Sequence, residues 1–332
     1  MPKAIHWSHL PVSTKLILLQ SLLIIALLGG GMTLLVRSVD QQLDERTVIQ
    51  LQQRNEITSA LMTAYSQSVI QVVSNMARVL NSRLQGHFEL DSSKINPSNV
   101  PILKKDGQVL NQDFAIVDWF HEVTGGVATI FARDGRDFVR VTTSLKKENG
   151  ERAVGTWLGT QHPAYAKIIA GETYAGQAKL FGRDYFTQYT PINDDHGQVI
   201  GLLFVGIDYT QSIQDLKNKI KELRIGVTGY SYAIDASKSE DRGIAVIHPT
   251  VEGQNLLKIG APDEREIIRE MLSQGQGVIR YPWVNRDLGE TEPRQKVVVY
   301  TLIPEWNWLL ASGSYEDEFI HDFHQIALFA VG

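Results

Sequence analysis

The chain contains no cysteine, which excludes disulfides, thiolate catalysis and cysteine-based zinc or iron–sulfur centres. This absence does not fix the compartment, because an exported domain with a large core folds without disulfides. A strong charge of one sign is also lacking: the net charge is −5 and no run of like charges occurs, so nothing indicates a nucleic-acid partner. The signature motifs of metalloproteases, serine hydrolases and P-loop enzymes are absent. We therefore expect a binding protein rather than an enzyme, with no metal and no cofactor.

The chain does contain one long hydrophobic run, from Leu16 to Val36, with no charged side chain. As a helix this run is ~31 Å long, about the thickness of a bilayer's hydrocarbon core. A cleaved signal peptide is the alternative, but its apolar region spans only about 7–15 residues and precedes a small-residue cleavage site that is not evident here. We therefore expect a retained transmembrane helix at 16–37.

The charges that flank this run predict its orientation. Lys3 and Lys15 precede it without an acidic residue, whereas Asp40 and Asp44 follow it. The excess of positive charge places residues 1–15 in the cytoplasm and the residues after about 37 in the periplasm, outside the inner membrane. The apolar stretch within 318–332 is too short to cross a bilayer, so it is either an amphipathic tail or the start of a second span.

The long segment 38–88 has no proline, and its apolar residues recur at spacings of three and four. This pattern predicts an amphipathic helix that continues out of the membrane, and its thin apolar stripe suits pairing with a copy of itself. Residues 87–113 have the polar, proline- and asparagine-containing composition of a loop region. The 332-residue chain is long enough for two further domains.

Short strands and helices then follow in an order that occurs twice: two strands, a helix and three strands. The segments 125–134 and 226–235 are similar to each other, and Tyr189–Ile192 is similar to Tyr300–Ile303. This repetition predicts an α/β (α+β) fold of two tandem modules with antiparallel sheets, at 89–209 and 210–317.

Several segments of this chain are familiar from one family. In the first module they are 131–155, 158–159, 162–165, 174–176, 180–182, 189–192 and 201–206. In the second module they are 229–232, 248–249, 252–256 and 306–308. On these segments the chain resembles, over roughly residues 38–318, the periplasmic sensor regions of bacterial methyl-accepting chemotaxis receptors. The specific subgroup joins a Cache module of the third class to one of the second class. The resemblance implies PAS-like modules, a membrane-distal first module, a small-molecule pocket, a homodimer and signalling across the membrane. It also implies a second span, which favours that interpretation of 318–332.

The candidate ligand-binding residues lie in the first module. Arg140, Thr142 and Ser144 alternate along the strand 138–145 and share one of its faces. A guanidinium there can contact a ligand carboxylate in a bidentate manner; a solvated outer face is the alternative. The resemblance places further candidates around the same space, although these are also typical core residues: Trp157, Tyr165, Tyr185 and Thr187.

Asp208 ends a strand, where it can accept a ligand's ammonium group or cap the following helix. His162 and His248 each precede a proline and are expected to have structural roles. The second module supplies secondary candidates: Tyr230, Tyr232, Asp235, Tyr281 and Trp283.

The resulting hypothesis is a dimeric chemoreceptor sensor that binds a small polar molecule, such as a carboxylate or an amino acid, and shifts helices by about 1–2 Å. Two alternatives remain open. The output can instead be a histidine kinase or a diguanylate cyclase, or the chain can be a membrane-tethered module that recognises a ligand-loaded binding protein.

Overall fold

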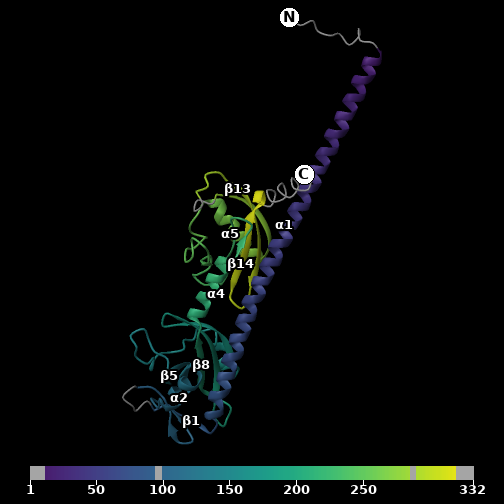
Figure 1. The fold of residues 1–332 in the computed structure, drawn as a ribbon. Helices are drawn as coiled ribbons and strands as arrows, with labels where there is room; N and C mark the ends of the chain where they lie inside the picture. Colours follow the sequence, from purple (N-terminus) through teal and green to yellow (C-terminus); the bar gives the residue numbers. More distant parts are fainter. Residues whose placement is uncertain (1–11, 94–98, 285–288, 319–332) are drawn as a thin grey trace. The chain divides into compact units, whose positions relative to one another are not determined.

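The computed structural model describes residues 12–93, 99–284 and 289–318. Its contacts divide the chain into two compact units. One unit contains residues 60–219; the other contains 1–59 together with 220–332. The helix α1, Val12–Arg83, contributes a segment to each unit (Figure 1).

The long helix α1 confirms the expected helix at 38–88, although it ends at Arg83. Its buried side chains follow the spacing that an amphipathic helix requires. In the unit of residues 60–219, α1 buries Met62, Val73 and Leu80. In the other unit, Leu51 of α1 packs against a sheet in one hydrophobic cluster, and Asn55 hydrogen-bonds to that sheet.

The unit of residues 60–219 is built on a five-stranded antiparallel sheet with the strand order β5-β4-β8-β7-β6. Short helices accompany the sheet, and a small three-stranded sheet has the order β1-β2-β3. The strand bounds of the large sheet are β4 Val127–Asp134, β5 Asp137–Thr143, β6 Tyr174–Leu180, β7 Arg183–Asn193 and β8 Val199–Asp208. The remaining elements are β1 Phe88–Asp91, β2 Ile102–Lys105, β3 Gln108–Val109, α2 Ala115–Thr124 and α3 Tyr165–Ile169.

The second unit is built on a six-stranded sheet with the order β11-β10-β14-β13-β12, to which β9 adds by pairing with β10. Helix α5 packs on this sheet through Met271 and Leu272. The bounds of its elements are β9 Arg224–Ile225, β10 Gly229–Asp235, β11 Ala245–Ile247, α5 Pro262–Gln274, β12 Gln276–Trp283, β13 Arg294–Ile303 and β14 Trp308–Tyr315. Helix α4, Thr210–Glu222, has residues in both units.

The two sheets have the same topology. In the first sheet β4 lies between β5 and the last strand, β8, and β7 and β6 follow β8. In the second sheet β10 lies in the same way between β11 and the last strand, β14, and β13 and β12 follow β14. This identity of strand order confirms the predicted repeat and the predicted α+β class with antiparallel sheets.

The prediction of a loop region at 87–113 is wrong in part. The segment forms the sheet β1-β2-β3, in which Asp106 and Gly107 occupy left-handed conformations at the β2–β3 turn, with φ of 49° and 78°. The prediction also misses helix α2, whose Val117 and Phe120 are buried. The strands of the small sheet are too short to show a periodicity, and tertiary packing stabilises them instead. Helix α2 does carry the spacing of an amphipathic helix, at Ile116, Val117, Phe120 and Val123, a signal that the prediction did not use.

Among the described residues, no helix is both long enough and apolar enough to cross a membrane. Most side chains of the expected span at 16–37 lie outside those described, so the span stays a prediction. All of the segment 318–332 except Glu318 lies outside the described residues.

Candidate functional site

A pocket of about 250 Å³ opens in the second module, on the face of the sheet that carries α5. Because successive side chains of a strand point to opposite faces, the tyrosines of β10, at positions 230 and 232, reach the same space as Tyr281 and Trp283 of β12. Further lining residues come from the loop after β11, from α5 and from β13. They include His248, Thr250, Val251, Leu256, Ile259, Glu264, Ile267, Ile268 and Lys296.

Lys296 of β13 supplies the pocket's one lysine or arginine side chain among the described lining residues. It is only 1% exposed. Its Nζ donates a hydrogen bond to Tyr230 Oη at 3.0 Å and lies 4.1 Å from the centroid of that ring and 5.5 Å from that of Trp283. No carboxylate within the described chain forms an ion pair with this ammonium group at 4.0 Å or less.

Burial lowers the pKa of Lys296 below its usual value of 10.5, while Tyr281 and Glu290 oppose the shift. A buried ammonium group without an anion is costly, by several kcal/mol before compensation. The surrounding rings recover part of this cost through cation–π attraction, at about 0.5–2 kcal/mol. An anionic ligand would supply the missing partner.

The aromatic walls of the pocket are held in fixed positions and protonation states. Burial raises the pKa of both Tyr232 and Tyr281, so these hydroxyls remain neutral donors. His248 packs edge-on against Tyr230, with ring centroids 5.2 Å apart. Its Nδ1 accepts hydrogen bonds from the backbone N–H groups of Thr250 and Val251, at 3.1 Å each, so a neutral His248 carries its proton on Nε2. The expected structural role of His248 is observed, and its ring also lines the pocket.

The first module contains a second buried cation, the predicted ligand-binding Arg140 of β5. Arg140 is 4% exposed, and its guanidinium carbon lies 4.7 Å from the ring centroid of Phe131. Its Nη1 donates to Thr156 Oγ1 at 2.6 Å, whereas its buried Nε has no hydrogen-bond partner. Burial lowers the pKa of Arg140 to about 10, against the opposing effect of Tyr189. The alternative of a solvated outer face is wrong, because Arg140 and Thr142 are both buried.

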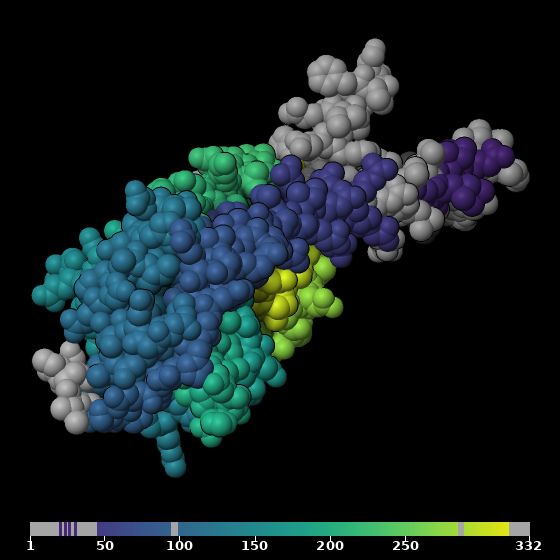
Figure 2. Space-filling model, turned by 90° about the horizontal axis from the view of Figure 1, so that it is seen from below, coloured from purple at the N-terminus to yellow at the C-terminus, as the bar shows by residue number. Residues whose placement is uncertain are grey.

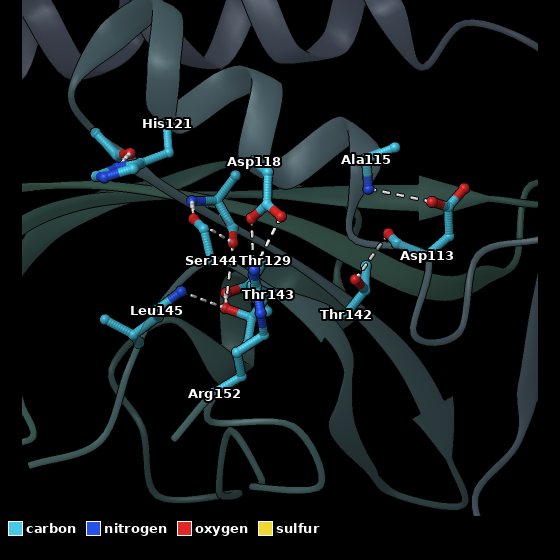
Figure 3. A network of polar contacts seen from close by, with 12 residues as sticks. Asp113, Ala115, Asp118, His121, Thr129, Thr142, Thr143, Ser144, Leu145 and Arg152 are labelled. Atoms are coloured by element: carbon cyan, nitrogen blue, oxygen red, sulfur yellow. Dashed lines mark hydrogen bonds and ion pairs between the residues drawn. The ribbon is translucent and has the colours of Figure 1, made fainter. Parts of the chain in front are cut away.

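The other polar candidates on β5 and β7 bond to the backbone. Thr142 donates to the Asp113 carbonyl at 2.9 Å, and Ser144 accepts from the backbone N–H of Ala128 at 2.9 Å, as Figure 3 shows. Thr187 donates to a backbone carbonyl, Gly176 O, at 2.8 Å.

The remaining first-module candidates are scattered around the fold. Tyr165 of α3 packs on the core cluster that contains Phe131 and Tyr189, so it shares this core with the ring that lies over Arg140. Tyr185 is buried in a separate cluster with Leu145 and Ala153. Trp157 is 48% exposed.

Asp208 is already engaged in the described structure. Its carboxylate forms an ion pair with Arg183 at 2.9 Å and accepts a hydrogen bond from the backbone N–H of Thr210 at the start of α4. This is the helix-capping alternative of the two roles considered above. The role of the first-module candidates in ligand binding stays a prediction.

Sequence reasoning missed the residue at the centre of the second pocket. Lys296 follows Arg294 and Gln295 in β13 and stands immediately before Val297, Val298 and Val299. A lysine that adjoins such an apolar run is a signal that pattern reading could have used. Four of the secondary candidates line the pocket, whereas Asp235 instead accepts a backbone hydrogen bond from Ser237.

Comparisons with known proteins place this geometry in context. The family model described as the Cache 3/Cache 2 fusion domain matches residues 36–327. The sensory domain of the Campylobacter jejuni chemoreceptor Tlp3 is 13% identical, covers 84% of this chain and 98% of its own, and has a TM-score of 0.47. The extracellular domain of mmHK1S-Z2, ascribed to a histidine kinase, is 12% identical, covers 84% and 99%, and has a TM-score of 0.45.

A third solved structure is described as showing carboxylic acid recognition by a Cache chemosensory domain. It is 30% identical, covers 31% of this chain and 71% of its own, and has a TM-score of 0.26. No curated protein matches the chain.

Proposed function

Because this chain belongs to the family of Cache 3/Cache 2 fusion domains, we propose that it is the extracytoplasmic ligand-sensing region of a chemotaxis transducer. In this proposal an inner-membrane anchor at 16–37 holds the sensor in the periplasm. The sensor binds a small organic anion and transmits binding to the membrane by displacing helices, without catalysing a reaction.

The observation that carries the proposal is the buried ammonium group of Lys296 at the wall of a preformed pocket, with no ion pair to a carboxylate among the described residues. Largely apolar and aromatic walls with a few convergent polar groups are typical of small-ligand sites. Lys296 and the neutral hydroxyl of Tyr230 converge on the polar end. A carboxylate placed there would gain charge-assisted hydrogen bonds, which are stronger than bonds between neutral groups.

The pocket favours a carboxylate without an amino group over an amino acid. Among the described lining residues, Glu264 is the only acid, and its Oε2 already accepts the backbone N–H of Ala261 at 2.8 Å as part of the α5 cap. A ligand ammonium would therefore lie beside apolar side chains and near a like charge. The volume of about 250 Å³ lies below the usual range for drug-sized ligands, so a small, partly apolar acid fits best.

A thermal-shift screen of the whole chain tests this proposal. The probes are acetate, propionate, benzoate, alanine and chloride at equal ionic strength. We expect at least one monocarboxylate to raise the melting temperature, no effect of alanine, and loss of the response in Lys296→Met. The variant Lys258→Met removes an exposed lysine of the same module and serves as the control. A wild-type chain that ignores every carboxylate, or a Lys296→Met chain that responds fully, contradicts the proposal.

The buried Arg140, with its unpartnered Nε, favours a second anion site in the first module. We propose that Arg140 binds an anion there, as the sequence pattern of β5 predicts. Any residual carboxylate response in Lys296→Met would come from this site, and adding Arg140→Met to that variant should remove it. If the two variants together respond like Lys296→Met alone, the first module has no such site.

The sensor is proposed to act as a homodimer through α1. Leu61, Val72 and Val79 are 54%, 41% and 39% exposed, and their spacings of 11 and 7 residues place them on one face of the helix. The outer surface of this part of α1 is visible in Figure 2. Leu61→Glu with Val72→Glu should lower the mass measured by light scattering, whereas Gln67→Glu on another exposed face should not. A dimer unaffected by the double change excludes this face.

The output of the sensor is tested by joining the chain to the signalling half of a chemoreceptor. We expect the chimera to change the swimming bias of cells when the effective carboxylate is added. An inert chimera, together with an active fusion to a histidine-kinase or diguanylate-cyclase half, would support those alternatives instead. Capture of a ligand-loaded binding protein with no direct carboxylate response would support the tethered recognition module.

A further inference from the structure

The Lys296 pocket adjoins a cluster of charges at the end of the second module. Arg294 lies two residues before Lys296 on β13, so both side chains emerge on the same face of the strand. Arg294 forms ion pairs with Glu290 at 2.7 Å, Asp317 at 2.7 Å and Glu318 at 3.1 Å. We call these four residues the Arg294 latch. The latch holds residues 317–318, beyond the last strand of the module.

Glu318 connects the latch to the residues just before β10, the strand that carries Tyr230 and Tyr232. It is 8% exposed and accepts hydrogen bonds from the backbone N–H groups of Val227 at 2.9 Å and Thr228 at 3.1 Å. Its Oε2 also accepts from the hydroxyl of Ser314 at 3.0 Å. Residues 227–228 lead directly into β10. Although burial opposes the shift, the hydrogen bonds from Thr228, Val227 and Arg294 lower the pKa of Glu318, so its carboxylate is ionised at neutral pH.

One buried ring separates the latch from the pocket. Tyr315 of β14 pairs directly with Lys296 of β13 and is fully buried. The guanidinium carbon of Arg294 lies 4.0 Å from the centroid of this ring, and Lys296 Nζ lies 6.0 Å from the same centroid. A buried aromatic spacer screens charges less than water does, and Glu290 of the latch favours the charged form of Lys296.

The sign of this interaction follows from the charges. The latch contains three carboxylates and one guanidinium, so it carries negative charge in excess. The positive charge of Lys296 stabilises that excess, and Glu290 in turn favours the protonated form of Lys296. An anion on Lys296 cancels this stabilising field and adds negative charge near the latch.

We propose that the pocket and the latch form one charge-coupled unit, in which a carboxylate bound to Lys296 weakens the hold of Arg294 and of residues 227–228 on residues 317–318. This inference rests on the proposed function for the identity of the ligand. It adds the route by which the effect of ligand binding is transmitted: from Lys296 across Tyr315 to the latch, and from the latch to residues 317–318, which follow β14.

Hydrogen exchange of the whole chain, measured by mass spectrometry, tests the coupling without a ligand. Lys296→Met removes the stabilising charge, so exchange at the N–H groups of Val227 and Thr228 should accelerate by about three- to tenfold relative to other amides of β10. Lys258→Met, which removes an exposed lysine, should leave it unchanged. Glu290→Gln should slow the exchange of these two amides. The latch then has less excess negative charge, and Arg294 is shared among fewer carboxylates.

Addition of propionate or benzoate to the wild-type chain should also accelerate exchange at Val227 and Thr228, with no effect in Lys296→Met. If Lys296→Met leaves these amides unchanged or slows them, and Glu290→Gln does not slow them, the coupling is refuted. If a carboxylate binds through Lys296 but the exchange of both amides stays constant, the coupling is refuted and the proposed function stands. If no carboxylate binds but the two variants behave as expected, the coupling stands and the proposed ligand is wrong.

Discussion

Replacement of Lys296 by methionine should stabilise the ligand-free protein. Lys296 is 1% exposed, and removing an ammonium group from water costs several kcal/mol in a protein interior. Cation–π attraction to Tyr230 and Trp283 returns about 0.5–2 kcal/mol, and the hydrogen bond to Tyr230 returns about 1.5–3 kcal/mol. Glu290 also favours the charged form of Lys296, but we expect these gains to fall short of the desolvation cost, and methionine has a similar volume and no charge.

We expect Lys296→Met to raise the free energy of unfolding, because methionine does not have to be desolvated as a charged group. Thermal melts of the whole chain, followed by circular dichroism, should show the transition of the second module at a temperature several degrees higher. The same variant should lose its carboxylate response and should exchange faster at Val227 and Thr228. A gain in global stability, together with loss of the carboxylate response and faster local exchange, is typical of replacing a charge that serves function rather than stability.

The pH dependence of stability provides an independent measure. Burial lowers the pKa of Lys296 in the folded state below 10.5, so between its folded and unfolded pKa values the unfolded chain binds more protons at this site. The stability of the wild-type chain should therefore rise relative to that of Lys296→Met as pH increases through this window, up to about pH 10.5. At lower pH the full penalty of the buried charge is present.

A lower melting temperature in Lys296→Met would refute this reasoning, because it would show that Lys296 stabilises the empty pocket. A difference between wild type and variant that stays constant from pH 7 to pH 10.5 would show that the lysine does not titrate abnormally. The Lys258→Met control accounts for the general effect of removing one positive charge from the same module.

Three further perturbations test the fold around the site. Asn55→Ala removes a buried amide that donates to Thr301 Oγ1 at 3.0 Å, so it should lower the free energy of unfolding of the second unit by about 1–3 kcal/mol; a neutral result in chemical denaturation would show that α1 is not anchored there. Leu80→Ala, at a fully buried position of α1, should cost about 2–5 kcal/mol in the first unit, measured by the same assay. The pKa of His87 should exceed 6.5 in an NMR titration, because its ring bonds to Asp195, and Asp195→Asn should lower it; since folding raises this pKa, the contribution to stability is present below pH 6.5 and is lost as pH rises through the folded value.

The regular elements of this protein could largely be predicted from local pattern. Spacings of three and four predicted the helix α1, and alternation predicted the strand β5, because these periods are properties of the backbone itself. The small sheet β1-β2-β3 could not be predicted, because its strands are short and are stabilised by the surfaces against which they pack. Helix α2 was missed although its apolar residues have helical spacing.

For the candidate site too, local features could be predicted from the sequence and tertiary contacts could not. The sequence showed that aromatic residues at 230, 232, 281 and 283 share strand faces, and that Arg140 lies on a β-strand. It did not show that Asp208 would bond to Arg183, or that Thr142 would bond to the backbone of Asp113. Partners distant in sequence are decided by the packing of whole elements.

The sequence by itself determined that the chain is cysteine-free and carries one long apolar run before a long helix and two repeated modules. Composition and periodicity are local, so they are readable without coordinates. Only the tertiary structure decided that Lys296 is buried, that three tyrosines and a tryptophan surround it, and that Tyr315 joins it to Arg294. Burial of a charge depends on the packing of strands that are far apart in the chain. For this reason the leading candidate site is now the Lys296 pocket of the second module and not the first-module site predicted from the sequence.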